Sequence, residues 1–363
     1  MKAAVLYQAN SPLVIEEVDI EGPKDGEVQV RITATGICHS DLHNIKGEWE
    51  AAFPAILGHE GTGIVEAVGG GVQNVRVGDR VILSFRPNCG RCANCVRGVP
   101  VICEGHKGSR KLMLDGTSRV SVRGKPLFVS TRLGTFAERV VCPGEQAIPI
   151  RQTIPPEVAA LIACCVTTGV CAVTNAAQVQ PGDRVAVIGC GGVGLNVIQG
   201  ARLVGASPIF AIDVVESKLS YAKEFGATHM LNASRVDAVK EVRELSQGGV
   251  DYAFEAIGLS HTVEQAVDCL RPGGKAVVVG MTAMGQRASV DAYSLVSQQK
   301  TLMGTSYGNA RQRIDIPRMA DLYLSGRLDL DRLISHRYRL EEINEGFARL
   351  ERGEAARGVV VFS

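Results

Sequence analysis

The sequence predicts an α/β protein with two domains, one rich in β-strands and one built on a doubly wound parallel sheet. Its 363 residues exceed the usual size of one domain. The first 150 residues contain short strand-like runs divided by Gly-Asp and Gly-Gly turns. From Asp183 onward, strand-like and helical runs alternate, which is typical of a parallel sheet with helices on both faces.

The elements follow from these patterns in chain order. Strand-like runs at 28–37, 60–69 and 79–85 precede a cysteine-rich lobe, and helix-prone sequence begins at Pro155. The strands of the second domain are expected at 184–189, 208–213, 250–258 and 275–281, and its first helices at 191–205 and 216–226. Two helical patterns follow Tyr307, and a last strand at 357–363 returns to the first domain. We therefore expect one domain over 1–165 plus 307–363, and the other over 166–306.

Composition excludes several classes of protein. A formal net charge of +1 and the lack of a long basic run give no general attraction to nucleic acid or to an anionic membrane. An odd number of cysteines, 11, and an N-terminus that opens directly on a strand pattern favour a reducing compartment. We expect a cytoplasmic protein.

One uncharged segment, 158–182, superficially resembles a membrane span. Its strongly apolar part, 158–173, is only 16 residues long and includes two threonines and a glycine. A spanning helix needs about 20 apolar residues. The sequence therefore favours a buried helix, or a pair of helices, near an active site.

A glycine fingerprint follows the first strand of the second domain. Gly189, Gly191 and Gly194 form G-x-G-x-x-G where a strand ends and a helix opens. The first glycine makes the tight turn, the second admits a pyrophosphate, and the third allows close packing of the helix. The helix N-terminus favours the anion. Asp213 ends the next strand, where an acid accepts hydrogen bonds from ribose hydroxyls and repels a 2′-phosphate, so NAD is favoured over NADP.

Two groups of metal-binding residues are present. Cys89, Cys92, Cys95 and Cys103 stand at spacings x2, x2 and x7, which suits a closed structural zinc site with four protein ligands. The dispersed residues Cys38, His59 and Cys164 offer three ligands. A fourth position open to water or substrate is typical of a catalytic zinc, so this group indicates an enzyme.

These motifs together resemble those of the zinc-dependent medium-chain alcohol dehydrogenases. The resemblance covers essentially the whole chain, through the segments 58–60, 115–126, 189–194, 343–347 and 353–362. It implies a GroES-like catalytic domain and a Rossmann NAD-binding domain. It also implies reversible oxidation of primary alcohols to aldehydes with NAD, and two zinc ions per subunit.

The resemblance assigns roles at the catalytic zinc. The Thr-Thr-Gly that follows 163–165 matches the Ser-Thr-Gly of the family, which places Cys164 on the metal and Cys165 beside it. Glu60 corresponds to the acid near the metal, and Asp41 to the carboxylate that orients His59. Zinc lowers the pKa of a bound oxygen. The proton released on oxidation would pass through Ser40 and the nicotinamide ribose to His43, which suits a terminal proton carrier.

The resemblance also implies the cofactor and substrate contacts. His39 and Arg357 match basic positions that contact the pyrophosphate in relatives. The remaining implied cofactor contacts are Thr168, Gly189, Gly191, Gly192, Val193, Gly194, Asp213, Lys218 and Val279. Trp49 and Phe85 match walls of the substrate pocket, which suggests apolar aliphatic or benzylic alcohols over polyols.

The closest alternative is a thiol-dependent formaldehyde dehydrogenase that acts on an S-hydroxymethyl adduct. The glutathione-using branch has an acidic residue where Trp49 stands, and this chain lacks it. The sequence leaves open the use of another thiol as the carrier of formaldehyde.

Two other interpretations are weaker. A zinc-ribbon nucleic-acid module would use Arg91, Arg97 and Lys107, but the near-zero net charge and the lack of interleaved aromatic residues argue against it. A quinone-oxidoreductase-like enzyme would leave the seven zinc-ligand positions unexplained. Because family members associate through the edge of the nucleotide-domain sheet, a homodimer or homotetramer is implied, with no nucleic-acid or membrane partner.

Overall fold

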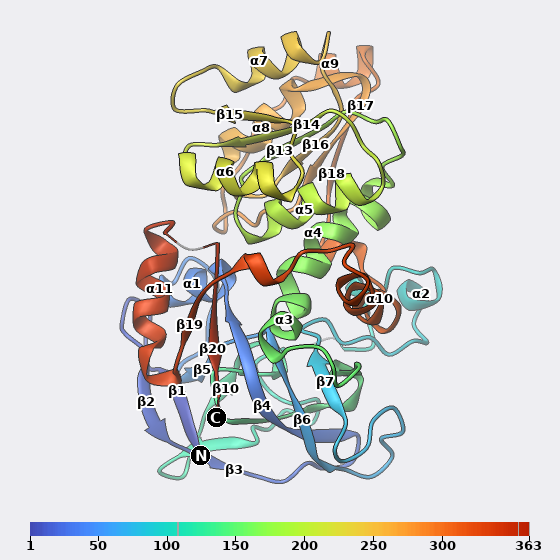
Figure 1. The fold of residues 1–363 in the computed structure, drawn as a ribbon. Coiled ribbons are helices and arrows are strands. Elements are labelled where there is room, and N and C mark those ends of the chain that lie inside the picture. The colour runs from blue at the N-terminus through green and yellow to red at the C-terminus, as the bar shows by residue number, and fades with distance from the viewer. Residues whose placement is uncertain (107–108, 355, 363) are drawn as a thin grey trace. The chain divides into compact units, whose positions relative to one another are not determined.

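The last strand of the chain lies between strands from the start and the end of the sequence (Figure 1). Strand β20 (Arg357–Val361) runs antiparallel to β4 (Glu27–Ile37) and parallel to β19 (Ile334–Tyr338). Buried valines of β20, among them Val359 and Val360, explain why this segment completes a sheet.

The computed structural model describes residues 1–106, 109–354 and 356–362, so Lys107 lies outside the described residues. The chain divides into two compact units, Met1–Cys164 with Arg311–Ser363, and Cys165–Ala310. The sequence led us to expect the divisions after residues 165 and 306.

The first unit is rich in β-structure, as the turn-punctuated sequence predicts. Its largest sheet has the order β12-β7-β6-β4-β20-β19, with β11 also paired to β4. A second sheet has the order β10-β5-β1-β2, and a third has the order β3-β8-β9. The strands not yet given are β1 (Lys2–Leu6), β2 (Val14–Glu17), β3 (Asp19–Ile20), β5 (Ala55–Ile56), β6 (Gly61–Val68), β7 (Arg80–Leu83), β8 (Val120–Val122), β9 (Lys125–Pro126), β10 (Phe128–Val129), β11 (Arg139–Pro143) and β12 (Ala147–Pro149).

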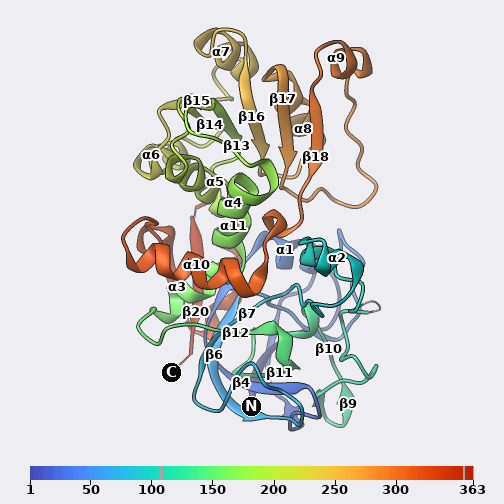
Figure 2. The same cartoon turned by 90° about the vertical axis from the view of Figure 1, so that its right-hand side faces the viewer.

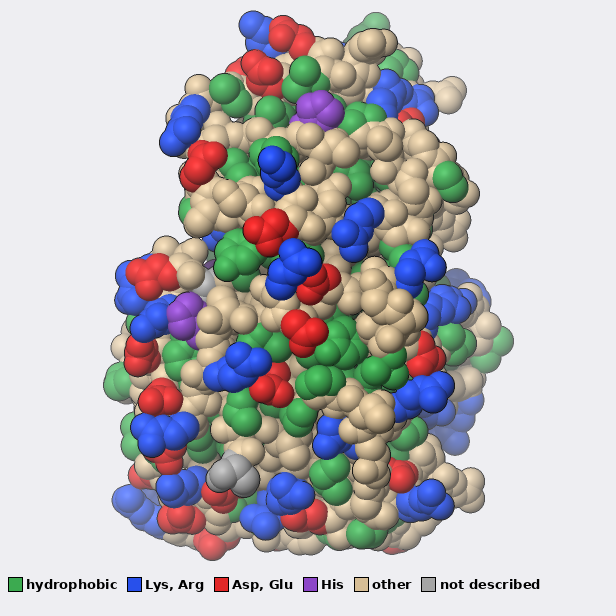
Figure 3. Space-filling model, viewed as in Figure 1, with side chains coloured by type: hydrophobic (Ala, Val, Ile, Leu, Met, Phe, Trp, Pro, Cys, Tyr) green, Lys and Arg blue, Asp and Glu red, His purple; other side chains and the backbone are tan. Residues whose placement is uncertain are grey.

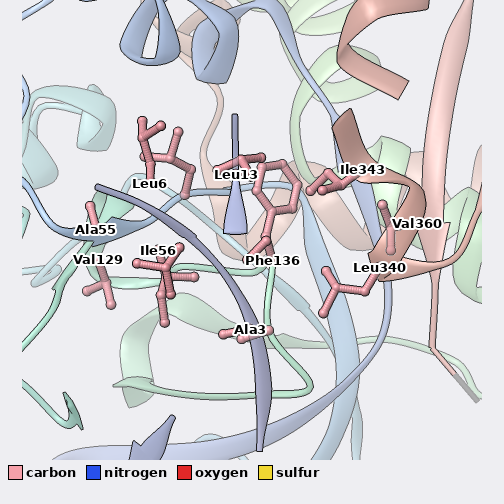
Figure 4. Close-up of a cluster of buried hydrophobic side chains, with 14 of the residues drawn as sticks. Ala3, Leu6, Leu13, Ala55, Ile56, Val129, Phe136, Leu340, Ile343 and Val360 are labelled. Carbon is pink, nitrogen blue, oxygen red and sulfur yellow. The ribbon is translucent and has the colours of Figure 1, made fainter. Parts of the chain in front are cut away.

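Few helices accompany these sheets. They are α1 (His39–Ile45), α2 (Ala93–Val96), α3 (Pro156–Leu161), α10 (Gln312–Leu324) and α11 (Ile343–Glu351). Figure 4 shows how α11 and β20 close one core, where Ile343 and Val360 pack with Phe136 and Leu6. This core holds β1, β5 and the C-terminal elements together.

The second unit is a six-stranded parallel sheet with the order β15-β14-β13-β16-β17-β18 (Figure 2). Its strands are β13 (Val185–Ile188), β14 (Ile209–Asp213), β15 (His229–Asn232), β16 (Val250–Glu255), β17 (Leu270–Val278) and β18 (Thr301–Gly304). Its helices are α4 (Thr167–Cys171), α5 (Gly192–Leu203), α6 (Glu216–Phe225), α7 (Ala238–Leu245), α8 (Ser260–Asp268) and α9 (Ala292–Ser297). The strand order reverses at β13, and such a switch point forms a nucleotide-binding crevice. The predicted alternation is confirmed.

The uncharged segment forms one helical run, Pro156–Ala177, of 22 residues. By length and composition it is able to cross a membrane, and it is longer than the 16 apolar residues counted in the sequence, because Pro156 and Glu157 precede those residues and 174–177 follow them. Within its most apolar window, 89% is buried inside the structure, as is typical of a core helix of a soluble protein. Two parts, Ile162–Val166 and Ala172–Ala177, are π-helical.

Charges of both signs are interspersed over the face shown in Figure 3. Many charged side chains of the protein are paired across short distances, as in the pairs Lys2–Glu341 and Arg337–Glu157. This face therefore offers no continuous basic surface of the kind that binds a phosphate backbone.

Candidate metal centre and cofactor site

Four buried side chains of the first unit converge on one point. Cys38, His59, Glu60 and Cys164 each offer a ligand atom, and these atoms all lie within 4.8 Å of one another. Exposed fractions are 8% for Cys38, 4% for His59, 7% for Cys164 and 0% for Glu60. The structure thus brings together the three residues that the sequence predicts as ligands.

Three of these side chains lie next to the ends of strands, and the fourth lies within a helical run. Cys38 follows β4 and is the N-cap of α1, and His59 and Glu60 directly precede β6. Cys164 lies in the π-helical turn Ile162–Val166. Such wider turns occur frequently at functional sites. The neighbouring Cys165 is fully buried and receives a contact from Asn196 Nδ2 at 3.8 Å, so it lies outside the cluster.

The electrostatics of the cluster favour a thiolate. The hydrogen bond with Cys164 lowers the pKa of Cys38 well below its usual range, with the charge of His59 also lowering it, and these outweigh the opposing effect of burial. Thiolate is the form that binds a metal. Burial lowers the pKa of His59, but the charges of Asp41 and Cys38 more than offset it, and the net shift is well upward. A metal ion would compete with that proton for the ring nitrogen.

Asp41 contacts the Nδ1 nitrogen of His59. It is fully buried, its Oδ1 accepts a hydrogen bond from the Gly58 N–H at 3.0 Å, and its Oδ2 lies 3.1 Å from His59 Nδ1. The second contact is an ion pair by distance, and among the described residues Asp41 Oδ2 has no hydrogen-bond partner. With Nδ1 facing the carboxylate, Nε2 is the nitrogen for a metal.

Glu60 is paired with Arg357 across the site. Glu60 Oε2 contacts Arg357 Nη2, and both side chains are buried. Burial raises the pKa of Glu60 to about 7, against the opposing charge of Arg357. Glu60 Oε1 has no hydrogen-bond partner among the described residues. Two thiols and an imidazole suit a catalytic zinc ion, which uses three protein ligands of these kinds. The Glu60 oxygen lies beside them.

The second group of cysteines also forms one cluster. The sulfurs of Cys89, Cys92, Cys95 and Cys103 lie within 4.8 Å of one another. Backbone N–H groups of Cys95 and Glu104 lower the pKa of Cys92 to about 6, whereas burial and the neighbouring thiols raise the pKa of Cys95 to about 12. All eleven cysteines are free of disulfide bonds. Four convergent sulfurs fit a closed structural zinc.

The predicted relay residues lie on α1. His39 is exposed at its first position, and Ser40 is half-buried. His43 Nδ1 contacts Glu48 Oε2, and its ring stacks on Trp49 with centroids 4.5 Å apart. Phe85 meets the His59 ring edge-on at a centroid distance of 5.3 Å. An apolar wall therefore borders the predicted zinc ligands.

The contact between Glu48 and His43 was not predicted from the sequence. His43 is five residues earlier, and the turn that joins them contains Gly47 at φ 68°. Lys-Gly-Glu directly after the helical pattern is the only sequence sign of that turn, because glycine commonly follows a helix C-terminus.

The glycine fingerprint has the predicted geometry. Gly189 has φ 97°, and a Cβ on it would lie 2.5 Å from Ile257 Cγ1. A Cβ on Gly194 would lie 1.7 Å from the Gly189 carbonyl oxygen, whereas a Cβ on Gly191 would meet nothing within 4 Å. The first and third glycines are thus required by the fold. The second faces open space at the N-terminus of α5, where a phosphate would fit.

Asp213 supports this loop from the end of β14. Its Oδ2 accepts a hydrogen bond from the Cys190 N–H at 2.8 Å, and its Oδ1 accepts one from the Val215 N–H at 3.0 Å. Each oxygen keeps a lone pair for a ribose hydroxyl. The remaining predicted cofactor residues of this unit are Thr168 and Val279, which are buried, and Gly192, Val193 and Lys218, which are half-buried.

Comparison with known proteins shows the family to which the chain is similar. The family model "Alcohol dehydrogenase GroES-like domain" matches residues 24–152, and "Zinc-binding dehydrogenase" matches residues 192–325. The chain is similar to an S-(hydroxymethyl)glutathione dehydrogenase of Paracoccus denitrificans, 39% identical over 99% of both chains. It is similar to an alcohol dehydrogenase class-3 of Cereibacter sphaeroides, 40% identical over 99% of both chains. Among solved structures, the benzyl alcohol dehydrogenase of Acinetobacter calcoaceticus has a TM-score of 0.94 and 32% identity, over 100% of this chain and 99% of that one.

Proposed function

The chain belongs to the zinc-dependent medium-chain alcohol dehydrogenases, and we propose that it oxidises primary aliphatic or benzylic alcohols to aldehydes, with NAD as hydride acceptor. The observation that carries this proposal is the buried cluster of Cys38, His59 and Cys164 with the Phe85 ring against His59. Apolar pockets with a few placed polar groups are typical of small-molecule sites. The similarity to a benzyl alcohol dehydrogenase supports the substrate class.

When bound, zinc supplies Lewis-acid chemistry and NAD accepts the hydride. The chain supplies the rest. Cys38, His59 and Cys164 hold the metal, and Asp41 orients His59.

Gly191 leaves room for the cofactor phosphates. Ser40 and His43 carry the released proton outward, and His39 and Arg357 provide positive charge toward the pyrophosphate. Thr168, Lys218 and Val279 complete the cofactor site. Cys89, Cys92, Cys95 and Cys103 hold a second, structural zinc.

A second candidate is oxidation of an S-hydroxymethyl adduct of a carrier thiol. The curated relative named S-(hydroxymethyl)glutathione dehydrogenase favours it. Trp49, however, stands where the glutathione-using branch has an acidic residue, and its ring is stacked on His43 instead of presenting a charge. Glutathione as the carrier is therefore disfavoured by this position, and a different thiol fits it better.

The test is NADH formation with benzyl alcohol, hexanol, a polyol, and formaldehyde with and without glutathione or other thiols. We expect turnover of the apolar alcohols, loss of activity with a chelator, and recovery with zinc. Turnover only in the presence of formaldehyde and a thiol would select the second candidate. Clear preference for the polyol would contradict the apolar pocket.

We propose that the protein is a homodimer or homotetramer that pairs through β18. This strand is one of the two edges of its sheet (Figure 2), and unpaired edges are usually covered. Nearby, α9 has no buried residue, and Tyr293 and Val296 are each 81% exposed. Light scattering on Tyr293→Lys with Val296→Glu should show smaller particles than the wild-type protein. An unchanged mass would place the interface elsewhere.

A cytoplasmic location is part of the same proposal, because eleven free cysteines suit a reducing compartment.

A further inference from the structure

Helix α1 ends in a Schellman motif whose two key positions are His43 and Glu48. The Glu48 N–H donates to the His43 carbonyl at 2.9 Å, and the Gly47 N–H donates to the Asn44 carbonyl at 3.2 Å. Gly47 takes the left-handed conformation that this motif requires. The motif brings the side chains of its first and last residues together, commonly as an apolar contact. Here the contact joins an imidazole and a carboxylate.

The contact uses one defined nitrogen of the ring. Glu48 Oε2 meets His43 Nδ1, and an ionised carboxylate only accepts hydrogen bonds, so Nδ1 carries the hydrogen. The Trp49 ring stacks on the imidazole with 21° between the planes. One edge and one face of the ring are thereby fixed. The free lone pair of the neutral ring is on Nε2.

Two other charged side chains near this turn, Lys46 and Asp41, contact other partners. Lys46 Nζ contacts Glu351 of α11 at 2.6 Å, so it does not neutralise Glu48. Asp41 is buried and faces Gly58 and His59. Glu50 is exposed. Glu48 is therefore the acid that contacts His43. Both side chains keep access to solvent, with exposed fractions of 38% for Glu48 and 22% for His43.

We propose that Glu48 is a positioning residue of the proton relay, which holds His43 in the Nδ1–H form so that Nε2 accepts the proton of the oxidised alcohol. This inference rests on the proposed function. Oxidation transfers the hydride to NAD and releases one proton. That proton bonds to Nε2, the Nδ1 hydrogen stays on the Glu48 contact, and the Nε2 proton then leaves to water. The arrangement matches the general use of a carboxylate to fix a histidine tautomer.

The test compares Glu48→Ala, Glu48→Gln and the control Glu50→Gln in the zinc-loaded protein. Nitrogen NMR of His43 at neutral pH should show hydrogen on Nδ1 in the wild type, in Glu50→Gln, and in Glu48→Gln, whose amide oxygen still accepts. In Glu48→Ala the hydrogen should be found on Nε2 in a substantial fraction of molecules.

Kinetics provide the second measurement. In Glu48→Ala we expect kcat for alcohol oxidation to fall about tenfold, a part of the 10²–10⁴ that general acid–base catalysis contributes. The KM values should stay within about twofold, since no substrate contact is lost, and the solvent deuterium isotope effect should rise. Glu48→Gln should recover most of kcat.

Unchanged NMR and kcat in Glu48→Ala would overturn the inference. An equal loss in all three variants would do so too, because it would reflect general charge effects. If the wild type oxidises no alcohol, the proposed function fails, whereas the NMR comparison still decides what Glu48 does to His43.

Discussion

Arg357 and Glu60 form an ion pair with side-chain exposed fractions of only 5% and 0%. Arg357 opens the last strand, β20, and Glu60 directly precedes β6 within the metal cluster. A Cβ on Gly36 would lie 1.9 Å from Glu60 Oε2, so a residue with a side chain at position 36 would collide with this carboxylate. The end of the chain is thus anchored at the predicted catalytic zinc.

Loss of Arg357 should strongly destabilise the first unit. Arg357→Leu leaves Glu60 buried without its cation, and breaking a buried pair in this way costs about 3–5 kcal/mol. Arg337→Leu removes the exposed pair with Glu157, whose side-chain exposed fractions are 59% and 20%, and should cost less than about 1 kcal/mol. Urea unfolding of both variants measures the difference, and similar losses would contradict it.

Two glycines of the fingerprint should respond oppositely to alanine. Gly194→Ala places a methyl group 1.7 Å from the Gly189 carbonyl oxygen, so the second unit should unfold or shift. Gly191→Ala meets nothing within 4 Å and should fold normally. If the cofactor phosphates lie there, NADH affinity should still fall at least about tenfold, or 1.4 kcal/mol. Thermal unfolding and NADH fluorescence titration separate the two effects. Full NADH affinity in Gly191→Ala would place the phosphates elsewhere.

The adjacent cysteines of the π-helical turn should differ in their effect on metal content. Cys164→Ser removes a thiolate from the cluster, and the protein should lose about one zinc per subunit together with its activity, because thiolate is a preferred zinc ligand. Cys165→Ser leaves the cluster intact and should retain both metals. Elemental analysis after gel filtration decides. Equal metal loss in the two variants would argue against Cys164 as the ligand.

Asp251 should contribute stability that depends on pH. Burial raises the pKa of Asp251, but the Arg184 N–H and the guanidinium groups of Arg184 and Arg271 outweigh it, and the net pKa is below the usual 3.8. A carboxyl with a lowered folded-state pKa stabilises above its unfolded pKa, and the contribution disappears as pH falls through the folded value.

The unfolding free energies of wild type and Asp251→Asn should therefore differ at pH 6 and converge below about pH 4. Denaturant titrations at several pH values test this. The control Glu264→Gln, in the same unit, should show no such convergence. A wild-type advantage that grows on acidification would contradict the assignment.

Much of the fold was predictable because its patterns are local. The alternation after Asp183 requires only neighbouring residues, and the parallel sheet confirms it. The two clusters of cysteine and histidine were predictable for a similar reason, since cysteine and histidine in such spacing have few other uses. The fold class and the family follow from these short segments.

Other features depend on contacts that spacing does not encode. Arg357 and Glu60 are 297 residues apart, and only the fold shows that they pair. Cys164 and Cys165 are equivalent by composition; the Thr-Thr-Gly match assigns Cys164, and the structure places Cys164 in the cluster of ligand atoms. The pairing of Glu48 with His43 depends on how α1 ends, and helix boundaries are the least certain part of any prediction from sequence.

The position of β20 between β4 and β19 sets an order for synthesis of the protein. On the ribosome, residues 1–164 emerge first, yet the strand that continues their main sheet beyond β4 is supplied by Arg357–Val361. The intervening unit, Cys165–Ala310, contains all six strands of its own sheet. It can fold before the last strands of the first unit have been synthesised. The N-terminal sheet is therefore completed only after Arg357–Val361 has been synthesised.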